Sequence, residues 1–86
     1  MPTVLRVNGF AIMIYANDHT DRAHVHCVKA GKVVVINLPT PTLAMVVREA
    51  QGMRQADVTA AFRIVAEHHE TLTASWKAIH GDKGTQ

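Results

Sequence analysis

Apolar and polar positions alternate along the first half of the chain and then change to a longer period. Thr3–Val7 is rich in β-branched residues, Asn8 and Gly9 follow it, and Phe10–Tyr15 is a second apolar run. Asn-Gly between two such runs predicts a tight hairpin, because a type I′ turn needs a positive φ at both central residues. Apolar residues lie on both faces of the second run, so we predict that it is a central strand.

The following residues predict a second hairpin. Residues 16–23 are polar and include Asn and Asp, which is typical of a surface loop. We expect a third strand over His24–Lys29, a turn at Ala30 and Gly31, and a fourth strand over Lys32–Leu38.

Two prolines, Pro39 and Pro41, end the fourth strand, because proline lacks the N–H that a strand ladder needs. Leu43–Arg48 then fits either a short edge strand or the start of a helix. We favour the strand.

The last third of the chain has a helical period. Within Ala56–His80 one stripe holds Val58, Phe62, Val65, Leu72, Trp76 and Ile79, with His69 completing the spacing. Asp57 favours the start of the helix through the helix dipole, and Gly81 supplies its end. One helix of about 25 residues would be roughly 37 Å long, so its far half could extend past a small sheet and pack against another molecule.

These elements predict an α+β fold: a small antiparallel β-sheet of four to five strands, formed by two hairpins, followed by one long C-terminal amphipathic helix. The 86 residues allow one hydrophobic core, and 48% hydrophobic with 19% charged residues is typical of a globular protein. We expect a single domain over residues 1–80 and a flexible tail over residues 81–86.

Composition narrows the classes of partner. The net charge of +2 comes without a clustered basic stripe, so nucleic acid is a partner that the sequence permits but does not favour. The single cysteine, Cys27, cannot form an internal disulfide, which fits the cytoplasm. The N-terminus lacks the pattern of a signal peptide, and no apolar run approaches the roughly 20 residues of a membrane span. We therefore expect a soluble, cytoplasmic protein with no membrane role.

The sequence His-X-His in the third predicted strand is the best candidate site. His24 and His26 are two residues apart, so their imidazoles project from one face of a strand and could chelate a divalent metal such as zinc. His19, Asp18 or Asp21 in the adjoining loop could supply a third ligand. Two other interpretations stay open: contact with a partner or substrate, and histidines that only support the strand and loop.

The same histidines fit a reaction without metal. One would act as general base and the other as general acid on a ribose phosphate, with Arg22 or Lys29 offsetting negative charge. Tyr15 is a further candidate donor, although packing against the sheet is the commoner role of such a tyrosine. In the predicted helix, we interpret His69 as a buried or interface histidine and Trp76 as core or interface packing.

Several segments together resemble one family. They are residues 1–9 followed by Phe10–Tyr15, the step from Tyr15 to His19, the motif Ala23-His24-Val25-His26, and residues 62–69 running on to Trp76. In these residues the chain resembles the small prokaryotic family catalogued as domain of unknown function 4160. The resemblance covers nearly the whole chain. It implies a bacterial cytoplasmic domain from toxin–antitoxin-like gene pairs and no particular activity.

The chain departs from this family at two points. The family tends to place prolines before His-X-His, where this chain has Asp21-Arg22-Ala23, and this loosens the preceding loop. The family also tends to have a serine at the helix N-cap, where this chain has Arg54, and the change weakens the start of the helix by about 1 kcal/mol.

The leading hypothesis is a binding or regulatory component of a two-protein, toxin–antitoxin-like module. It would use the His19, His24 and His26 face as a contact or metal site and the C-terminal helix for association with a protein partner or a second copy. The alternative is a ribonuclease toxin, either metal-dependent or histidine-based. A plain nucleic-acid-binding module has the least support, because the basic residues are few and the aromatic residues are expected to pack in the core.

Overall fold

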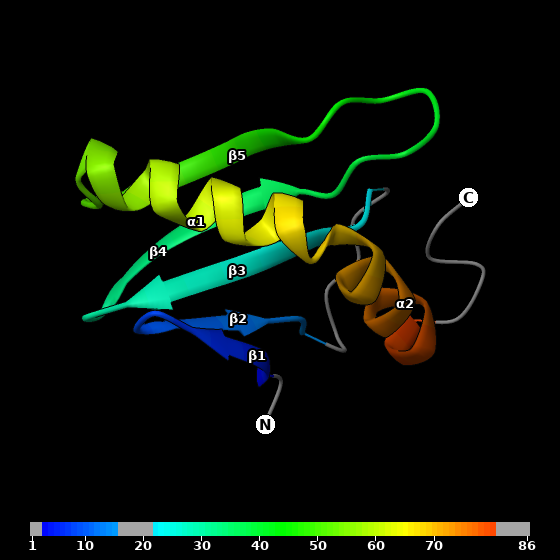
Figure 1. Cartoon of the computed structure of the whole chain (residues 1–86), viewed down its shortest axis with the longest axis horizontal. Helices are drawn as coiled ribbons and strands as arrows, with labels where there is room; N and C mark the ends of the chain where they lie inside the picture. The colour runs from blue at the N-terminus through cyan, green and yellow to red at the C-terminus, as the bar shows by residue number, and fades with distance from the viewer. Residues whose placement is uncertain (1–2, 16–21, 81–86) are drawn as a thin grey trace.

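A computed structural model describes residues 3–15 and 22–80 of the chain. Over these residues the protein forms one five-stranded antiparallel sheet followed by two helices (Figure 1). The strands are β1 (Thr3–Val7), β2 (Phe10–Met13), β3 (His24–Lys29), β4 (Lys32–Asn37) and β5 (Val46–Gln51), and the helices are α1 (Gln55–Glu67) and α2 (His69–His80). The α+β class predicted from the sequence is confirmed.

The strands lie in the sheet in the order of the sequence, β1-β2-β3-β4-β5, and each pairs with its neighbour antiparallel. Both predicted hairpin turns are present, with positive φ at Asn8 and Gly9 and again at Ala30 and Gly31. The segment after Pro41 forms a strand as favoured, but the strand lies at Val46–Gln51 and not at Leu43–Arg48. The loop predicted over residues 16–23 and the tail over residues 81–86 lie largely or wholly outside the described residues.

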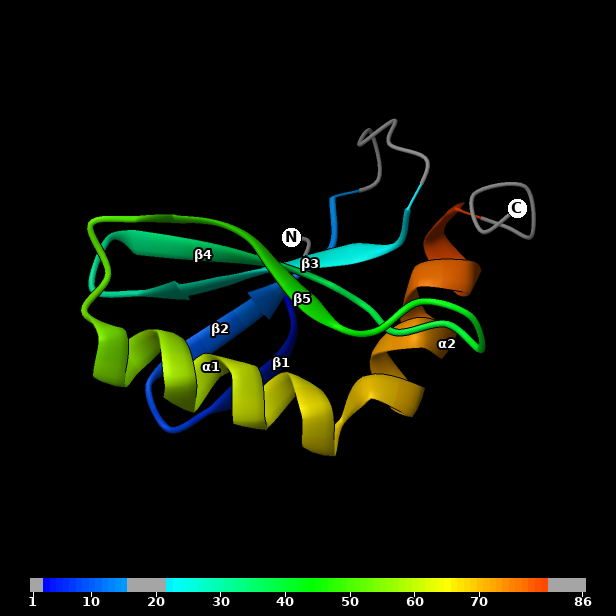
Figure 2. The ribbon, with the colours of Figure 1, turned by 90° about the horizontal axis from the view of Figure 1, so that it is seen from above.

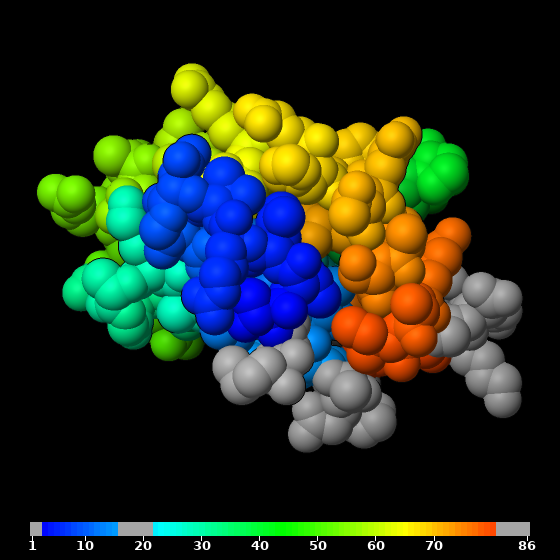
Figure 3. Space-filling model, turned by 60° about the horizontal axis from the view of Figure 1, so that its bottom comes forward, coloured from blue at the N-terminus to red at the C-terminus, as the bar shows by residue number. Residues whose placement is uncertain are grey.

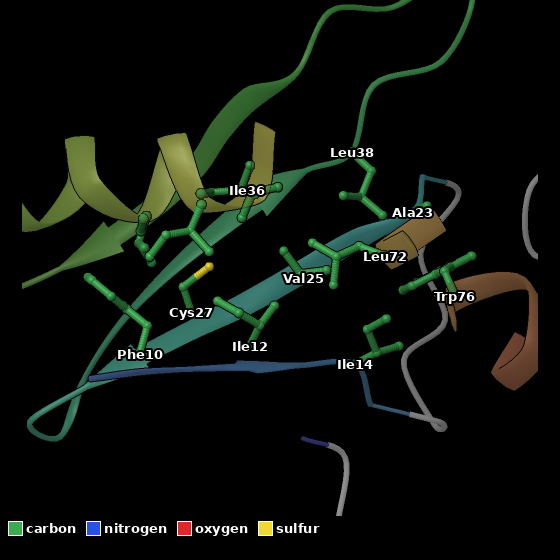
Figure 4. Packing of buried hydrophobic residues seen from close by; sticks show 14 residues of the cluster. Phe10, Ile12, Ile14, Ala23, Val25, Cys27, Ile36, Leu38, Leu72 and Trp76 are labelled. Atoms are coloured by element: carbon green, nitrogen blue, oxygen red, sulfur yellow. The ribbon is translucent and has the colours of Figure 1, made fainter. Parts of the chain in front are cut away.

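The core lies between one face of the sheet and the two helices (Figure 2). Side chains that alternate along β2, β3 and β4 point into this layer, where Ala61, Ile64 and Val65 of α1 meet them. Figure 4 shows the sheet residues of the core, among them Phe10, Ile12, Val25, Cys27 and Ile36. On the opposite face of the sheet, which we call the open face, the described helices make contact at the end where β3 begins, where Trp76 of α2 packs against His24.

The prediction of one long C-terminal helix was wrong, because the helical segment breaks at His68. The backbone of His68 leaves helical geometry, with φ −114° and ψ 15°, and its N–H is shared between the carbonyls of Ile64 and Val65. Neither glycine nor proline marks the break in the sequence. A straight continuation would carry the second half beyond the end of the sheet, whereas the bend lets Leu72 and Trp76 reach 0% and 1% exposure.

The second helix therefore lies at the end of the sheet where β3 begins and β4 ends (Figure 1). The space-filling view shows the β1–β2 hairpin bordered on one face of the molecule by α1 and α2 (Figure 3). Among residues 3–15 and 22–80, neither helix is long and apolar enough to cross a membrane.

Candidate functional site

The two histidines of His-X-His lie side by side on β3. Val25 and Cys27 point into the core, so strand alternation directs His24 and His26 to the open face. Their ring centroids are 5.3 Å apart and the ring planes are 61° from parallel. The two histidines therefore share one face of β3, as the period of two predicts.

His24 is held in a fixed orientation. Its side chain is only 2% exposed, and its Nδ1 lies 3.0 Å from the backbone carbonyl oxygen of Arg22. A carbonyl oxygen can only accept, so Nδ1 carries the hydrogen and donates it. In the neutral imidazole this places the lone pair on Nε2.

The two histidines belong to a longer series of rings, which we call the aromatic row. Tyr15 meets His26 edge to face at 4.7 Å and 86°, and beyond His26 the ring of His24 lies 5.1 Å from that of Trp76. Trp76 in turn stacks on His80 at 3.9 Å with the planes 23° apart. The aromatic row thus runs from the end of β2 across β3 to the last turn of α2, and its members are Tyr15, His26, His24, Trp76 and His80.

His80 was not among the residues predicted from the sequence. A signal was present, because Trp76 and His80 are four residues apart and such residues lie on one face of a helix. Nε2 of His80 and Oδ1 of Asn37 are buried, and neither has a hydrogen-bond partner among residues 3–15 and 22–80. Asn37 lies opposite His24 in the β3–β4 ladder. Buried polar atoms usually have a hydrogen-bond partner, and here two of them lack one within the described residues beside the aromatic row.

Only two of the predicted metal ligands can be located. His24 and His26 are adjacent, whereas His19, Asp18 and Asp21 lie outside the described residues. Within the described part of the chain, no group of three or more His, Cys, Asp or Glu side chains could hold a metal ion. A divalent metal such as zinc therefore stays a prediction that rests on a pair of imidazoles.

The basic residues Arg22 and Lys29 lie at opposite ends of β3. Arg22 donates from Nη2 to the carbonyl oxygens of Leu38 and Ala44, and so ties the segment after β4 to the start of β3. Lys29 lies five residues beyond His24 along the strand, roughly 16 Å away. Its Nζ is 3.4 Å from Oδ1 of Asp57 in α1, so it is not a neighbour of the histidines.

The side chains of Tyr15 and Cys27 complete the description of the site. Tyr15 is 37% exposed and donates its hydroxyl hydrogen to the sulfur of Met13, 3.4 Å away. Cys27 is fully buried on the core side, and burial raises the pKa of its thiol to about 12. This cysteine is therefore neither a nucleophile nor a ligand for the histidine pair.

A groove that the sequence did not predict lies near Arg22. It consists of two adjoining hollows of about 500 and 490 Å³ between residues 39–43 and α2. Both hollows are lined by Pro39, Thr40, Pro41, Thr73 and Lys77, with Arg22 in one of them and His69 in the other. The lining of the groove comes from segments about 30 residues apart. These segments come together because the helical segment bends at His68.

Comparison with known proteins gives one match. The family model described as domain of unknown function 4160 matches residues 9–77, and the match includes four of the five members of the aromatic row. No curated protein and no solved structure matches the chain.

Proposed function

This chain belongs to the domain of unknown function 4160 family, and we propose that it is the binding component of a two-protein, toxin–antitoxin-like module. The proposed contact is the open face of the sheet around Tyr15 and His26. The proposed partner is the protein encoded beside it.

The observation that carries this proposal is the fixed arrangement of the aromatic row. Tyr15 and His26 hold each other edge to face, and His26 is backed by the buried ring of His24. Binding therefore costs little side-chain entropy at these positions, because the rings are already oriented before a partner arrives. Tyrosine is also among the residues enriched at protein interfaces, since its ring is apolar and its hydroxyl is polar.

The surroundings of the pair favour a protein partner. Met13 and Val28 occupy the open face beside His26, and Val46 on the same face of β5 is 43% exposed. Away from His24 no described helix covers this apolar face, and a second protein can bury such a surface. The hydrogen-bonded strands beneath it keep the surface rigid.

The experiment is a titration of the purified chain with the product of the neighbouring gene, followed by calorimetry. We expect Tyr15→Ala and His26→Ala each to weaken the complex by about tenfold or more, the effect of losing one well-packed anchor. Ile79→Ala is the matched control, because Ile79 is as exposed as Tyr15, 38% against 37%, and lies on α2. Absence of a complex, or equal weakening by Ile79→Ala, would refute the proposal.

One observation favours a second candidate function, RNA cleavage by the histidine pair. The hydrogen bond from His24 to the Arg22 carbonyl places the lone pair of the neutral His24 ring on Nε2, the tautomer that a general base requires, with His26 beside it as a general acid. The low exposure of His24 counts against it, because a substrate must reach Nε2. Growth arrest on expression that His24→Ala and His26→Ala each abolish, with folding intact, would support this function.

A divalent metal at the same pair is part of this second candidate. Zinc or nickel titration of the untagged protein, compared with a His24→Ala/His26→Ala double variant, tests it directly. Stoichiometric binding lost in the double variant would support a metal site, and no binding by the wild type would exclude one at this pair.

A further inference from the structure

The edge strand β5 is the most exposed element of the sheet. All six of its residues are exposed, and among the described strands it pairs only with β4. The outer side of such a strand presents N–H and C=O groups in the spacing that another strand requires. Among the described residues β5 therefore has an unpaired edge on which a further strand can pair on either side of its bulge.

Exposed apolar side chains gather at this edge. The described residues include five large hydrophobic side chains that are well exposed: Tyr15, Leu43, Val46, Val47 and Ile79. Three of the five fall within residues 43–47: Leu43, at 50%, precedes β5, and Val46, at 43%, and Val47, at 39%, are its first two residues. This concentration gives the edge an apolar surface in addition to its hydrogen-bonding groups.

A bulge in β5 sets which of its residues share a face. Val47 is the partner of Ile36 and Ala50 is the partner of Val34, so Val47 and Ala50 lie on the helix side of the sheet. Arg48 is the extra residue at the bulge, between Val47 and Glu49.

Val46 and Gln51 lie on the other side of the sheet, the open face. Val46 is the partner of Asn37 and Gln51 is the partner of Val33. The hydrogen bond of 2.8 Å from Gln51 to the carboxylate of Glu49 places Glu49 on this face as well.

We propose that β5 is the contact surface for a second copy of this chain, and that the two β5 strands pair antiparallel to join the two sheets. A two-fold axis perpendicular to the sheet keeps each face on its own side, so paired residues must share a face. With the axis between Arg48 and Glu49, Val47 meets Ala50 of the second copy on the helix side, and Val46 meets Gln51 on the open face. In a strand without a bulge, this register would pair residues that lie on opposite faces. The extra residue at the bulge shifts the alternation by one, so that Val47 pairs with Ala50 and Val46 with Gln51 on a common face.

The same register makes the charges complementary. In this register Arg48 of each copy lies opposite Glu49 of the other along the strands, and symmetry produces this pair twice. Charged residues on an edge strand normally oppose pairing with arbitrary strands. A second, antiparallel copy places Glu49 opposite Arg48 and Arg48 opposite Glu49. The two charges therefore favour pairing with a second copy over pairing with another strand.

The test is sedimentation velocity from about 1 µM to about 1 mM, a range that covers a contact smaller than the standard interface. The wild type is expected to show a monomer–dimer equilibrium. Arg48→Glu alone, or Glu49→Arg alone, sets like charges against each other twice and is expected to raise the dissociation constant about tenfold or more. The double variant Arg48→Glu/Glu49→Arg restores both pairs and is expected to return the constant to within about threefold of the wild type.

Arg63→Glu is the matched control, because it reverses the charge of another exposed arginine, on α1. It is expected to leave the equilibrium unchanged. Amide hydrogen exchange at high concentration is expected to protect β5 and to lose that protection in Arg48→Glu. A wild type that stays monomeric throughout, equal weakening by Arg63→Glu, or no recovery in the double variant would overturn the proposal. Because the charge-reversal variants change neither Tyr15 nor His26, a loss of the dimer in these variants and a loss of the partner complex in Tyr15→Ala or His26→Ala are distinguishable results.

Discussion

The indole of Trp76 in α2 lies against the imidazole of His24 in β3, with 5.1 Å between the ring centroids and 53° between the ring planes. Both side chains are buried, at 1% and 2% exposure. This contact attaches the last helix to the end of the sheet, and it also provides the wall against which the histidine pair is oriented. The candidate site and the packing of α2 therefore both depend on Trp76.

The first prediction concerns this residue. Trp76→Ala is expected to lower the free energy of unfolding by about 3–5 kcal/mol, because it removes a fully buried indole and leaves a cavity. Ile79→Ala, three residues further along the helix and 38% exposed, is expected to cost less than about 1 kcal/mol. Urea unfolding measures both.

If Trp76→Ala leaves too little folded protein to measure, Trp76→Phe takes its place. It keeps an aromatic ring at the position and is expected to lower the free energy of unfolding by less than the alanine variant. Equal destabilisation by Trp76→Ala and Ile79→Ala would show that α2 is not anchored through the indole.

Most of the fold follows from local signals, and the break at His68 shows where they end. Asn8 and Gly9 predict their hairpin because positive φ is a property of two adjacent residues. The bend at His68 has no local cause in the sequence, since it arises from the length of the sheet and the burial of Leu72 and Trp76. A helical period identifies an apolar stripe, but it does not state how far the surface beneath that stripe extends.

The second prediction is a loss of stability at alkaline pH through Cys27. Burial raises the pKa of its thiol from 9.0 to about 12. Above pH 9 the unfolded chain releases this proton while the folded protein retains it. The contribution of the protonated Cys27 thiol to the free energy of unfolding is therefore complete below pH 9. It is lost as the pH rises towards 12, at up to about 1.4 kcal/mol per pH unit.

Cys27→Ala is the control, because it has no group that titrates at this position. We expect the free energies of unfolding of the wild type and of Cys27→Ala to converge between pH 9 and 11 in urea titrations. A difference that stays constant over this range would contradict the raised pKa.

The third prediction uses the two hairpin turns as a matched pair. Ala30 and Gly31 have φ values of 52° and 77°, close to the 49° and 84° of Asn8 and Gly9. Alanine is strained in the left-handed region, whereas asparagine tolerates it. Ala30→Asn is therefore expected to raise the free energy of unfolding by about 0.5–1 kcal/mol.

The reciprocal change, Asn8→Ala, is expected to lower that free energy by a similar amount. Thermal unfolding of both variants measures the pair. Opposite signs support the assignment of the two turns to one type, and destabilisation by both substitutions would contradict it.

The candidate site was only partly accessible to sequence reasoning. The spacing of His24 and His26 predicts their common face, because strand alternation is a local property. The burial of His24 was not predictable in the same way, since it depends on Trp76, more than 50 residues later. The presence of His80 in the aromatic row likewise follows from where α2 packs after the bend.

The last prediction concerns the first turn of α1. Arg54 is the N-cap residue, with φ −65° and ψ 152°, and its side chain forms no capping hydrogen bond. The N–H groups of Asp57 and Val58 both lie 2.9 Å from the carbonyl oxygen of Arg54, so the backbone already has the geometry of a capped helix. Arg54→Ser would place a hydroxyl oxygen where it can accept from the N–H of Asp57.

Arg54→Ser is therefore expected to raise the free energy of unfolding by about 0.5–1 kcal/mol. The substitution also removes the contact of 3.8 Å between Arg54 and the carboxylate of Asp57, but Arg54 is 83% exposed and such a contact contributes little. Arg54→Ala separates the two effects, because it removes the same contact without adding a cap. Urea unfolding should rank serine above both arginine and alanine at this position, and an equal free energy for the serine and alanine variants would mean that no capping bond forms.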